Sequence, residues 1–295
     1  MRLIKWITGN KDLNNAAEKT DPQRSPAVSG ERALLADTPY VLPKDKQEEE
    51  RIAFQHRFLK SIFNLYNVPF PVAANILDVG SGAGMWSREM AHNFPGAQVY
   101  AIDLEEPKIT GHLETNNYHY VQANILKTFP FPENTFDYVY QRLLVAAIPT
   151  TMWSFLFIEE LRVLKSGGWL EVLEVSDVCV NAGPVMEQFL HWGRTACARN
   201  GIYLAAVKEV GMTLKSIGLQ NITSKEVNVP IGAWGGPNGK KFAIDMQHIF
   251  GALKYFYHKN AEVPLDKFDY FLNILPQEWE QYQTSYVYYH VYGQK

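Results

Sequence analysis

Cysteine, net charge and closely spaced metal ligands are all scarce in this 295-residue sequence. Its two cysteines, Cys179 and Cys197, are too few for a disulfide framework or a four-thiolate metal site, and such a chain suits a reducing compartment. The formal net charge is only -3, which gives no strong field of one sign to attract nucleic acid or acidic lipid. The eight histidines lack the short spacing of a zinc site. We therefore expect no metal ion and no nucleic-acid partner.

Long apolar runs are also missing. Residues 143–148 and 152–158 are apolar, but neither approaches the roughly 20 residues that span a bilayer. The apolar run within residues 1–8 is interrupted by Lys5 and is shorter than the core of a signal peptide, roughly 7 to 15 residues. The sequence thus predicts a cytoplasmic protein without a membrane partner, and it leaves the oligomeric state open.

Apolar and aromatic residues, in contrast, are plentiful. Apolar residues make up 46% of the chain and charged residues 20%, as in folded globular proteins. Phe, Trp and Tyr account for 39 residues, and 14 of them lie within 242–295, where an even distribution would place about seven. Core packing explains most of this excess by default, but its position also favours a bulky apolar or aromatic substrate.

Hydrophobic periodicity divides the chain into alternating elements. Residues 1–37 are polar and have no sustained period, so we expect a flexible tail followed by a single domain over 38–295. The first amphipathic helix is expected at about 44–66. Beyond it the pattern predicts strands at 75–79, 98–102, 118–122, 136–141, 169–175, 222–230 and 285–292, and helices at 85–94, 151–165, 184–199, 205–217 and 240–258. This alternation indicates an α/β fold with a largely parallel sheet covered by helices on both faces.

A glycine-rich loop, Ile76-Leu-Asp-Val-Gly-Ser-Gly-Ala-Gly84, follows the first expected strand and opens a helix, which lets the backbone approach a ligand. The dinucleotide fingerprint needs its last glycine where Met85 stands, and no Lys-Ser/Thr pair of a phosphate-binding loop is present. Asp78 would repel a pyrophosphate but favour a cationic ligand. Asp103, which ends the second strand, is placed to accept the hydroxyls of a ribose. The pattern therefore favours a nucleoside that carries an ammonium or a sulfonium group.

With these motifs the sequence resembles the class I S-adenosylmethionine (SAM) dependent methyltransferases, closely over about 74–176. The family usually has Asp where this chain has Asn124. A narrower likeness, to bacterial and fungal LaeA-like methyltransferases, lies in 38–43, Gln55-His56 and 230–234. The segments similar to family motifs are 77–84 (motif I), 101–103 (motif II), 122–125 (the adenine-contacting segment), 136–142 (motif IV) and 164–169 (the turn before strand five).

The resemblance implies a Rossmann-like, seven-stranded, mostly parallel sheet with the last strand antiparallel, and SAM as the cofactor. It divides the domain into a helical N-terminal lid at 38–70, a cofactor-binding core at 74–176, and substrate-side helices and closing strands at 177–295. For Asp103 a helix N-cap, and for Asn124 an ordinary turn residue, are the alternatives. The implied cofactor-binding residues are Asp78, Gly80, Ser81, Gly82, Ala83, Asp103, Leu104, Asn124, Ile125 and Gln141.

The substrate side is less defined. Tyr40, Arg142 and Trp234 are candidate substrate contacts. His56 and Glu174 are candidate catalytic bases, although methyl transfer from a sulfonium mainly needs alignment of the nucleophile and a base is optional. His56 shares an inward helix face with apolar residues, so a buried structural histidine is the alternative.

The sequence therefore predicts an enzyme, a SAM-dependent methyltransferase (EC 2.1.1.-) that acts on a small-molecule acceptor of aromatic or secondary-metabolite type. The alternative is a SAM-binding regulatory protein of LaeA-like type that acts through protein partners. NAD-linked oxidoreduction is opposed by Met85 and Asp78.

Overall fold

The computed structural model describes residues 40–43, 45–107 and 115–295, so the expected tail at 1–37 lies outside the described residues. A seven-stranded sheet in the order β3-β2-β1-β4-β5-β7-β6 forms the centre of the molecule. The strands are β1 (Asn75–Val79), β2 (Gln98–Asp103), β3 (Tyr118–Gln122), β4 (Phe136–Arg142), β5 (Leu164–Val180), β6 (Gln220–Pro230) and β7 (Ser285–Gln294).

The sheet is parallel except at its last strand. β1 pairs in parallel with β2 and β4, β2 with β3, and β4 with β5, whereas β7 runs antiparallel to both β5 and β6. The predicted Rossmann-like fold class is confirmed. Because the inner strands are parallel, the ends of β1, β2 and β4 meet at one edge of the sheet, where open α/β folds bind ligands.

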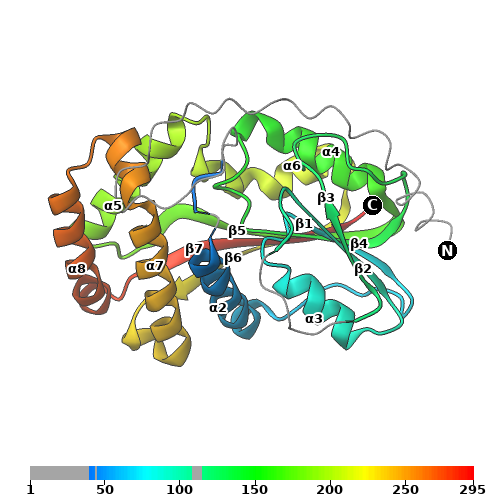
Figure 1. Ribbon diagram of the computed structural model, residues 1–295, viewed down its shortest axis with the longest axis horizontal. Coiled ribbons are helices and arrows are strands. Elements are labelled where there is room, and N and C mark those ends of the chain that lie inside the picture. The colour runs from blue at the N-terminus through cyan, green and yellow to red at the C-terminus, as the bar shows by residue number, and fades with distance from the viewer. Residues whose placement is uncertain (1–39, 44, 108–114) are drawn as a thin grey trace.

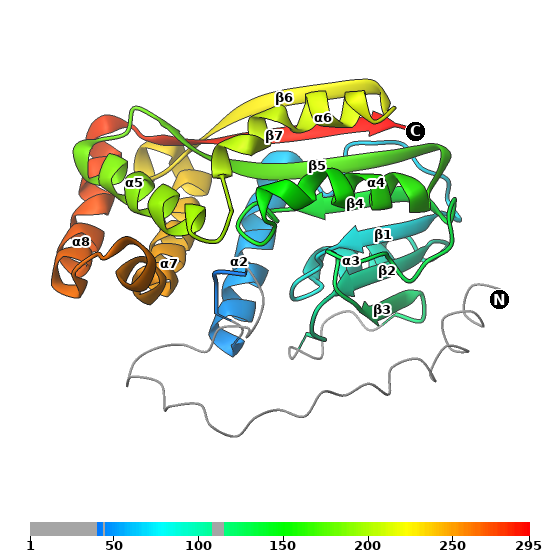
Figure 2. The ribbon, with the colours of Figure 1, turned by 90° about the horizontal axis from the view of Figure 1, so that it is seen from above.

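Helices cover both faces of the sheet, with α4 and α6 on one side and α2 and α3 on the other (Figure 1). The helices are α2 (Lys46–Phe63), α3 (Met85–Asn93), α4 (Trp153–Val163), α5 (Pro184–Ala198), α6 (Val210–Ser216), α7 (Gly236–Ala261) and α8 (Leu265–Tyr282), with short 3-10 turns η2 (Thr150–Met152), η3 (Leu204–Glu209) and η4 (Ala233–Gly235). Helices α5, α7 and α8 lie together beyond the end of β5 and the start of β7, away from β2 and β3 (Figure 2).

The start of α2 follows from its sequence. Asp45 caps the helix, since its carboxylate accepts a hydrogen bond from the Glu48 backbone N–H at 2.9 Å. Glu48 and Glu49 in the first turn also favour this end of the helix dipole.

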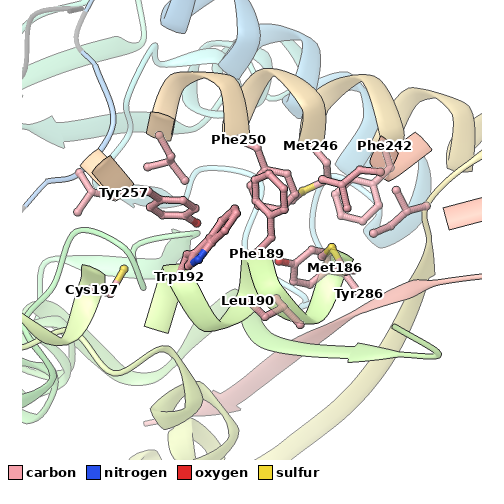
Figure 3. Packing of buried hydrophobic residues seen from close by; sticks show 14 of the residues in the cluster. Met186, Phe189, Leu190, Trp192, Cys197, Phe242, Met246, Phe250, Tyr257 and Tyr286 are labelled. Atoms are coloured by element: carbon pink, nitrogen blue, oxygen red, sulfur yellow. The ribbon is translucent and has the colours of Figure 1, made fainter. Parts of the chain in front are cut away.

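Most of the aromatic side chains of the C-terminal third pack into one apolar cluster between α5, α7, α8 and β7. The rings of Phe189 of α5 and Phe250 of α7 pack in a tilted arrangement with their centroids 4.7 Å apart, and Trp192 and Tyr257 lie beside them (Figure 3). Tyr286 of β7 closes the cluster from the sheet. This cluster adjoins the functional site described below.

Three elements differ from the sequence-based expectation. Helix α8 has no counterpart among the predicted elements, because Pro276 inside it breaks the helical pattern that would mark it in the sequence. Strand β5 is longer than predicted at both ends, and it carries a register shift against β7. Helix α7 is also longer than the predicted 240–258, since it begins at Gly236 and ends at Ala261.

Candidate functional site

The loop between β1 and α3 adopts a conformation that needs glycine. Gly80, Gly82 and Gly84 have φ angles of 67°, 55° and 68°, in the left-handed region that side chains disfavour. At Gly80 an added Cβ would also lie 2.5 Å from the Leu144 Cδ2 atom. The loop is anchored to β2, because the Gly80 backbone N–H donates to the Ile102 carbonyl at 2.9 Å. The glycines thus bring the main chain close to the sheet edge and leave room above it.

Asp103 lies beside this loop at the end of β2. One carboxylate oxygen accepts the Gly82 backbone N–H at 2.8 Å, and the other accepts the Leu104 backbone N–H at 2.7 Å. The carboxylate therefore links the ends of β1 and β2 and faces the space above the glycine loop. It does not cap a helix, so the N-cap alternative for Asp103 is not realised.

Asp78 is a buried carboxyl at the end of β1. Burial raises its pKa to about 7, while the nearby Arg142 guanidinium opposes this shift. Its Oδ2 atom, like the buried hydroxyl of Ser81, has no hydrogen-bond partner in the described part of the chain. Buried polar atoms normally have partners, so both atoms indicate a site that a polar or cationic ligand completes.

These residues open into a cavity of about 350 Å³ at the carboxyl edge of the sheet. Two parts of the chain distant in sequence, the glycine loop and α7, face each other across it. Ten of the residues that the sequence singled out line this cavity: Tyr40, Asp78, Gly80, Ser81, Gly82, Asp103, Leu104, Asn124, Ile125 and Arg142. Asn124 also makes a turn, since its Oδ1 accepts the Leu126 backbone N–H at 2.9 Å.

The other five candidates do not line the cavity. Ala83 is buried within the glycine loop, and Gln141 is buried on β4, where its amide donates to Glu174. Trp234 lies in η4, where its indole N–H donates to the Ile231 carbonyl at 2.8 Å. The remaining two, His56 and Glu174, are the candidate bases.

His56 of α2 is buried, as its helix face predicted, and its ring is held between two charged side chains. Its Nε2 lies 2.7 Å from a Glu89 carboxylate oxygen, and its Nδ1 lies 3.4 Å from the Arg142 guanidinium. Burial, reinforced by the Arg142 charge, lowers the pKa of His56 to about 4. The imidazole is therefore neutral at physiological pH and is a weak base.

Glu174 on β5 binds the backbone of the loop that follows β4. Its carboxylate accepts the backbone N–H groups of Leu144 at 2.9 Å and Val145 at 3.0 Å. Burial raises its pKa to about 7, and these backbone hydrogen bonds oppose the shift. Since Leu144 and Val145 line the cavity, Glu174 fixes part of the cavity wall from behind.

Sequence reasoning missed a buried ionic cluster over the cavity. Arg51 of α2 donates to Glu48 at 2.7 Å and to Asp245 of α7 at 2.8 Å, and Gln55 donates to the other Asp245 oxygen at 2.8 Å. Arg51 and Gln55 both line the cavity. Arg51 and Asp245 are 194 residues apart, so no local sequence pattern predicts that they form an ion pair. The lone Asp within the apolar face of α7 was the only available signal.

The far half of the cavity is an apolar chamber. We use "acceptor chamber" for the part lined by Met246, Phe250, Leu253 and Phe256 of α7, Cys197 of α5, and Tyr286 and Tyr288 of β7. The phenol of Tyr257 also faces it. Burial raises the pKa of these three tyrosines, so their hydroxyls stay protonated. The cavity thus joins a polar end at the glycine loop to an aromatic end.

Comparison with known proteins agrees with this fold. A methyltransferase domain family matches residues 76–168. The methyltransferase str3 of Strobilurus tenacellus is 30% identical over 196 residues, which cover 66% of this chain and 69% of that protein. The chain therefore belongs to the SAM-dependent methyltransferases, as the resemblance predicted, and the predicted cofactor of the family, SAM, is confirmed with it.

Other similar proteins include an N-methyltransferase and a regulator of secondary metabolism. The N-methyltransferase sirN of Leptosphaeria maculans is 24% identical, over 79% of this chain and 84% of that protein. The secondary metabolism regulator laeA of Aspergillus niger is 23% identical, over 66% of this chain and 54% of that protein. A solved structure of phosphoethanolamine N-methyltransferase 2 from Haemonchus contortus shares the fold, with a TM-score of 0.50 and 18% identity. The match covers 83% of this chain and about half, 52%, of that one.

None of the helices in the described part of the chain has the length and apolar character needed to cross a bilayer.

Proposed function

We propose that the chain binds SAM at the glycine-loop end of the cavity and transfers its methyl group to a small, largely apolar acceptor held in the acceptor chamber. The observation that carries the proposal is the pairing of the two ends in one cavity. Asp78, Asp103 and the glycine loop form the polar end, and aromatic side chains of α7 and β7 form the other.

The residues at the polar end fit the cofactor. The unpartnered Asp78 Oδ2 and Ser81 hydroxyl provide acceptors for an ammonium group. Asp103 is a carboxylate at the end of β2, where a ribose would offer two hydroxyls. Gly80 allows this close packing of the loop, since a Cβ there would meet the side chain of Leu144 in the cavity wall. Asn124 and Ile125 border the cavity beyond β3, where we place the adenine.

When bound, SAM supplies a methyl group already activated by its sulfonium. The task of the protein is then to orient the acceptor nucleophile in line with the methyl carbon, at roughly 3 to 3.5 Å, and to exclude water. Phe250, Leu253 and Phe256 provide the apolar wall that excludes water. The protonated hydroxyls of Tyr257, Tyr286 and Tyr288 donate hydrogen bonds to oxygen atoms of the acceptor.

The described residues around the cavity offer few proton acceptors. Apart from Asp78 and Asp103, the lining contains no carboxylate, and it contains no imidazole among the residues that the structure describes. His56 and Glu174 act behind the wall rather than on the acceptor. We therefore propose a reaction that depends on alignment and exclusion of water, without removal of a proton by either residue.

The segment that precedes and forms α2 closes the cavity from above. Tyr40, Val41 and Leu42, together with Arg51 and Ile52, line it. Because this segment lines the cavity, we propose that it moves as a lid, which the Arg51–Asp245 ion pair holds closed. The two cysteines, Cys179 and Cys197, are free thiols. Free thiols are typical of a reducing compartment, so we propose that the protein is located in the cytoplasm.

A methyl-transfer assay tests this function. Purified protein is incubated with isotopically labelled SAM and a panel of phenols, carboxylic acids and amines on apolar ring systems, and labelled products are separated by chromatography. We expect transfer to at least one member, and we expect Asp103→Ala to abolish it while leaving the melting temperature within a few degrees. NADH binding tighter than SAM would overturn the proposal.

A second candidate is the regulatory function. It is favoured by the relatives named as secondary metabolism regulators, among them LAE1 of Cochliobolus heterostrophus at 24% identity. The two functions separate in one experiment: SAM binding with no transfer to any small molecule, together with SAM-dependent capture of a protein partner, favours the regulator.

A further inference from the structure

Arg142 is a cation at the polar end of the cavity, and the proposed methyl transfer assigns it no partner. It ends β4 and lines the cavity. No carboxylate lies within ion-pair distance of its guanidinium in the described part of the chain. Arg51 differs, because Glu48 and Asp245 already neutralise it at 2.7 and 2.8 Å. Arg142 therefore presents the positive charge at this end that is not already used within the protein.

The guanidinium of Arg142 lies between two ring side chains. Burial raises the pKa of the Tyr140 hydroxyl and the nearby Arg142 charge opposes this shift, while the Tyr140 ring stacks on Trp86 at a centroid distance of 4.1 Å. On the other side the guanidinium lies 3.4 Å from the Nδ1 atom of His56. Fixed orientation is what makes a guanidinium selective for the planar fork of a carboxylate.

The hydrogen bonds of His56 determine its tautomer. Glu89 accepts at 2.7 Å from Nε2, so this nitrogen carries the proton. Nδ1 then has a lone pair and accepts from Arg142, which has only donors. The low pKa of His56 keeps this arrangement at neutral pH. The other carboxylate oxygen of Glu89 forms an ion pair with the Lys60 Nζ atom at 2.6 Å. A chain of contacts thus runs from the surface, through a neutral histidine, to the cation in the cavity.

Asp78 provides a carboxyl group near the Arg142 guanidinium. Arg142 is close enough to lower the pKa of the Asp78 carboxyl, against the effect of burial, and both residues line the same end of the cavity. A carboxylate and a guanidinium at one end match the two charges of an α-amino acid in its zwitterionic form. The glycine loop lies beside them.

We propose that Arg142 binds the carboxylate of the amino-acid part of SAM, and that His56, oriented by Glu89, is a positioning residue for Arg142. This inference rests on the proposed function, since it assigns one group of the same cofactor. It gives His56 a task through Arg142 in place of a task as a base.

Ligands that differ only in the carboxylate test the proposal. Calorimetry with SAM and with decarboxylated SAM is done on the wild type and on Arg142→Gln. We expect the wild type to prefer SAM by at least about tenfold, and we expect Arg142→Gln to lose this preference, since a hydrogen bond between charged groups contributes roughly a factor of 10 to 100. Equal weakening of both ligands would overturn the assignment. Failure of the wild type to bind either ligand would instead refute the proposed function.

Variants of His56 test its positioning role. In His56→Asn an oxygen replaces the Nδ1 acceptor, and in His56→Phe the ring remains without any acceptor. We expect His56→Phe to reduce the preference for SAM severalfold and His56→Asn to restore most of it, although both break the contact with Glu89. Arg57→Gln is the matched control: it removes one positive charge from the exposed side of α2, next to His56 in the chain, and should leave the preference unchanged.

Protein stability is measured on every variant by thermal unfolding, and Arg142→Lys serves if Arg142→Gln does not fold. Lysine keeps the charge but loses the planar fork, so an intermediate preference is expected. A preference in Arg142→Lys or in His56→Phe that equals the wild type would overturn the proposal.

Discussion

Replacement of Arg51 by methionine removes the cation from a cluster that is closed to solvent. The side chain of Arg51 is 6% exposed, that of Glu48 is 2% exposed and that of Asp245 is fully buried. Methionine fills most of the space of arginine but leaves the carboxylates without their cation. Removal of one partner of a buried ion pair typically costs about 3–5 kcal/mol. For a domain of this size each kcal/mol lowers the melting temperature by about 2–4 °C, so we expect a decrease of roughly 6–20 °C.

The change should also depend on pH. Burial already raises the pKa of Asp245 above its ordinary value, and Arg51 is the strongest opposing influence. Without Arg51 the folded-state pKa rises further, so the folded protein holds a proton that the unfolded chain releases. The stability of Arg51→Met should therefore decrease as pH rises from the unfolded pKa through the raised folded value. Thermal unfolding of Arg51→Met relative to the wild type at pH 5, 6, 7 and 8 measures this difference.

The matched variant is Asp245→Asn. It leaves Arg51 with Glu48, which accepts from both its Nε at 3.0 Å and its Nη2 at 2.7 Å, so the loss should be smaller, about 1–3 kcal/mol. An Arg51→Met protein that melts as the wild type does, or that loses less stability than Asp245→Asn, would refute the reasoning. Equal destabilisation at pH 5 and pH 8 would refute the electrostatic part alone.

Three further predictions concern the cavity. Gly80→Ala places a methyl group against Leu144 in a left-handed conformation, so it should cost about 1–3 kcal/mol in unfolding free energy and weaken binding of S-adenosylhomocysteine in calorimetry. Because burial raises the pKa of Asp78 to about 7, affinity for S-adenosylhomocysteine should rise roughly tenfold from pH 6 to pH 8 as the carboxyl ionises, and an equal rise in Asp78→Asn would contradict this. Burial, with a smaller effect of Asp177, raises the pKa of the Cys197 thiol to about 12, so its alkylation by iodoacetamide, followed by mass spectrometry, should be slow at pH 8 and accelerate about tenfold per pH unit up to pH 10; a rate at pH 8 equal to that of a free cysteine would refute it.

The cofactor half of the molecule could be predicted well from the sequence because its signals are local. β1 and β3 begin and end where the sequence predicted, and β2 and β4 differ by one residue. The glycines of the β1–α3 loop have the positive φ angles that such a turn requires. Each of these features depends on residues that are adjacent in the chain and on the period of a buried strand.

The acceptor half could not be predicted to the same depth because its contacts join distant segments. Arg51 meets Asp245 only through the packing of α2 against α7, and His56 meets Arg142 only through the folding of α2 over β4. Trp234 belonged to a recognisable local motif, yet its place is set by the tertiary position of η4, away from the cavity lining. The aromatic excess lies in this region, but the sequence cannot tell cavity wall from core.

A crystal structure of the protein with S-adenosylhomocysteine tests the central claim most directly, that the cavity at the carboxyl edge of the sheet is the methyl-transfer site. The account predicts the ribose on Asp103, the adenine beside Asn124 and Ile125, the amino-acid end between Asp78 and Arg142, and the sulfur open to the acceptor chamber. Ligand density elsewhere on the molecule, or in this cavity with the ribose away from Asp103 and the sulfur closed off from the chamber, would contradict it.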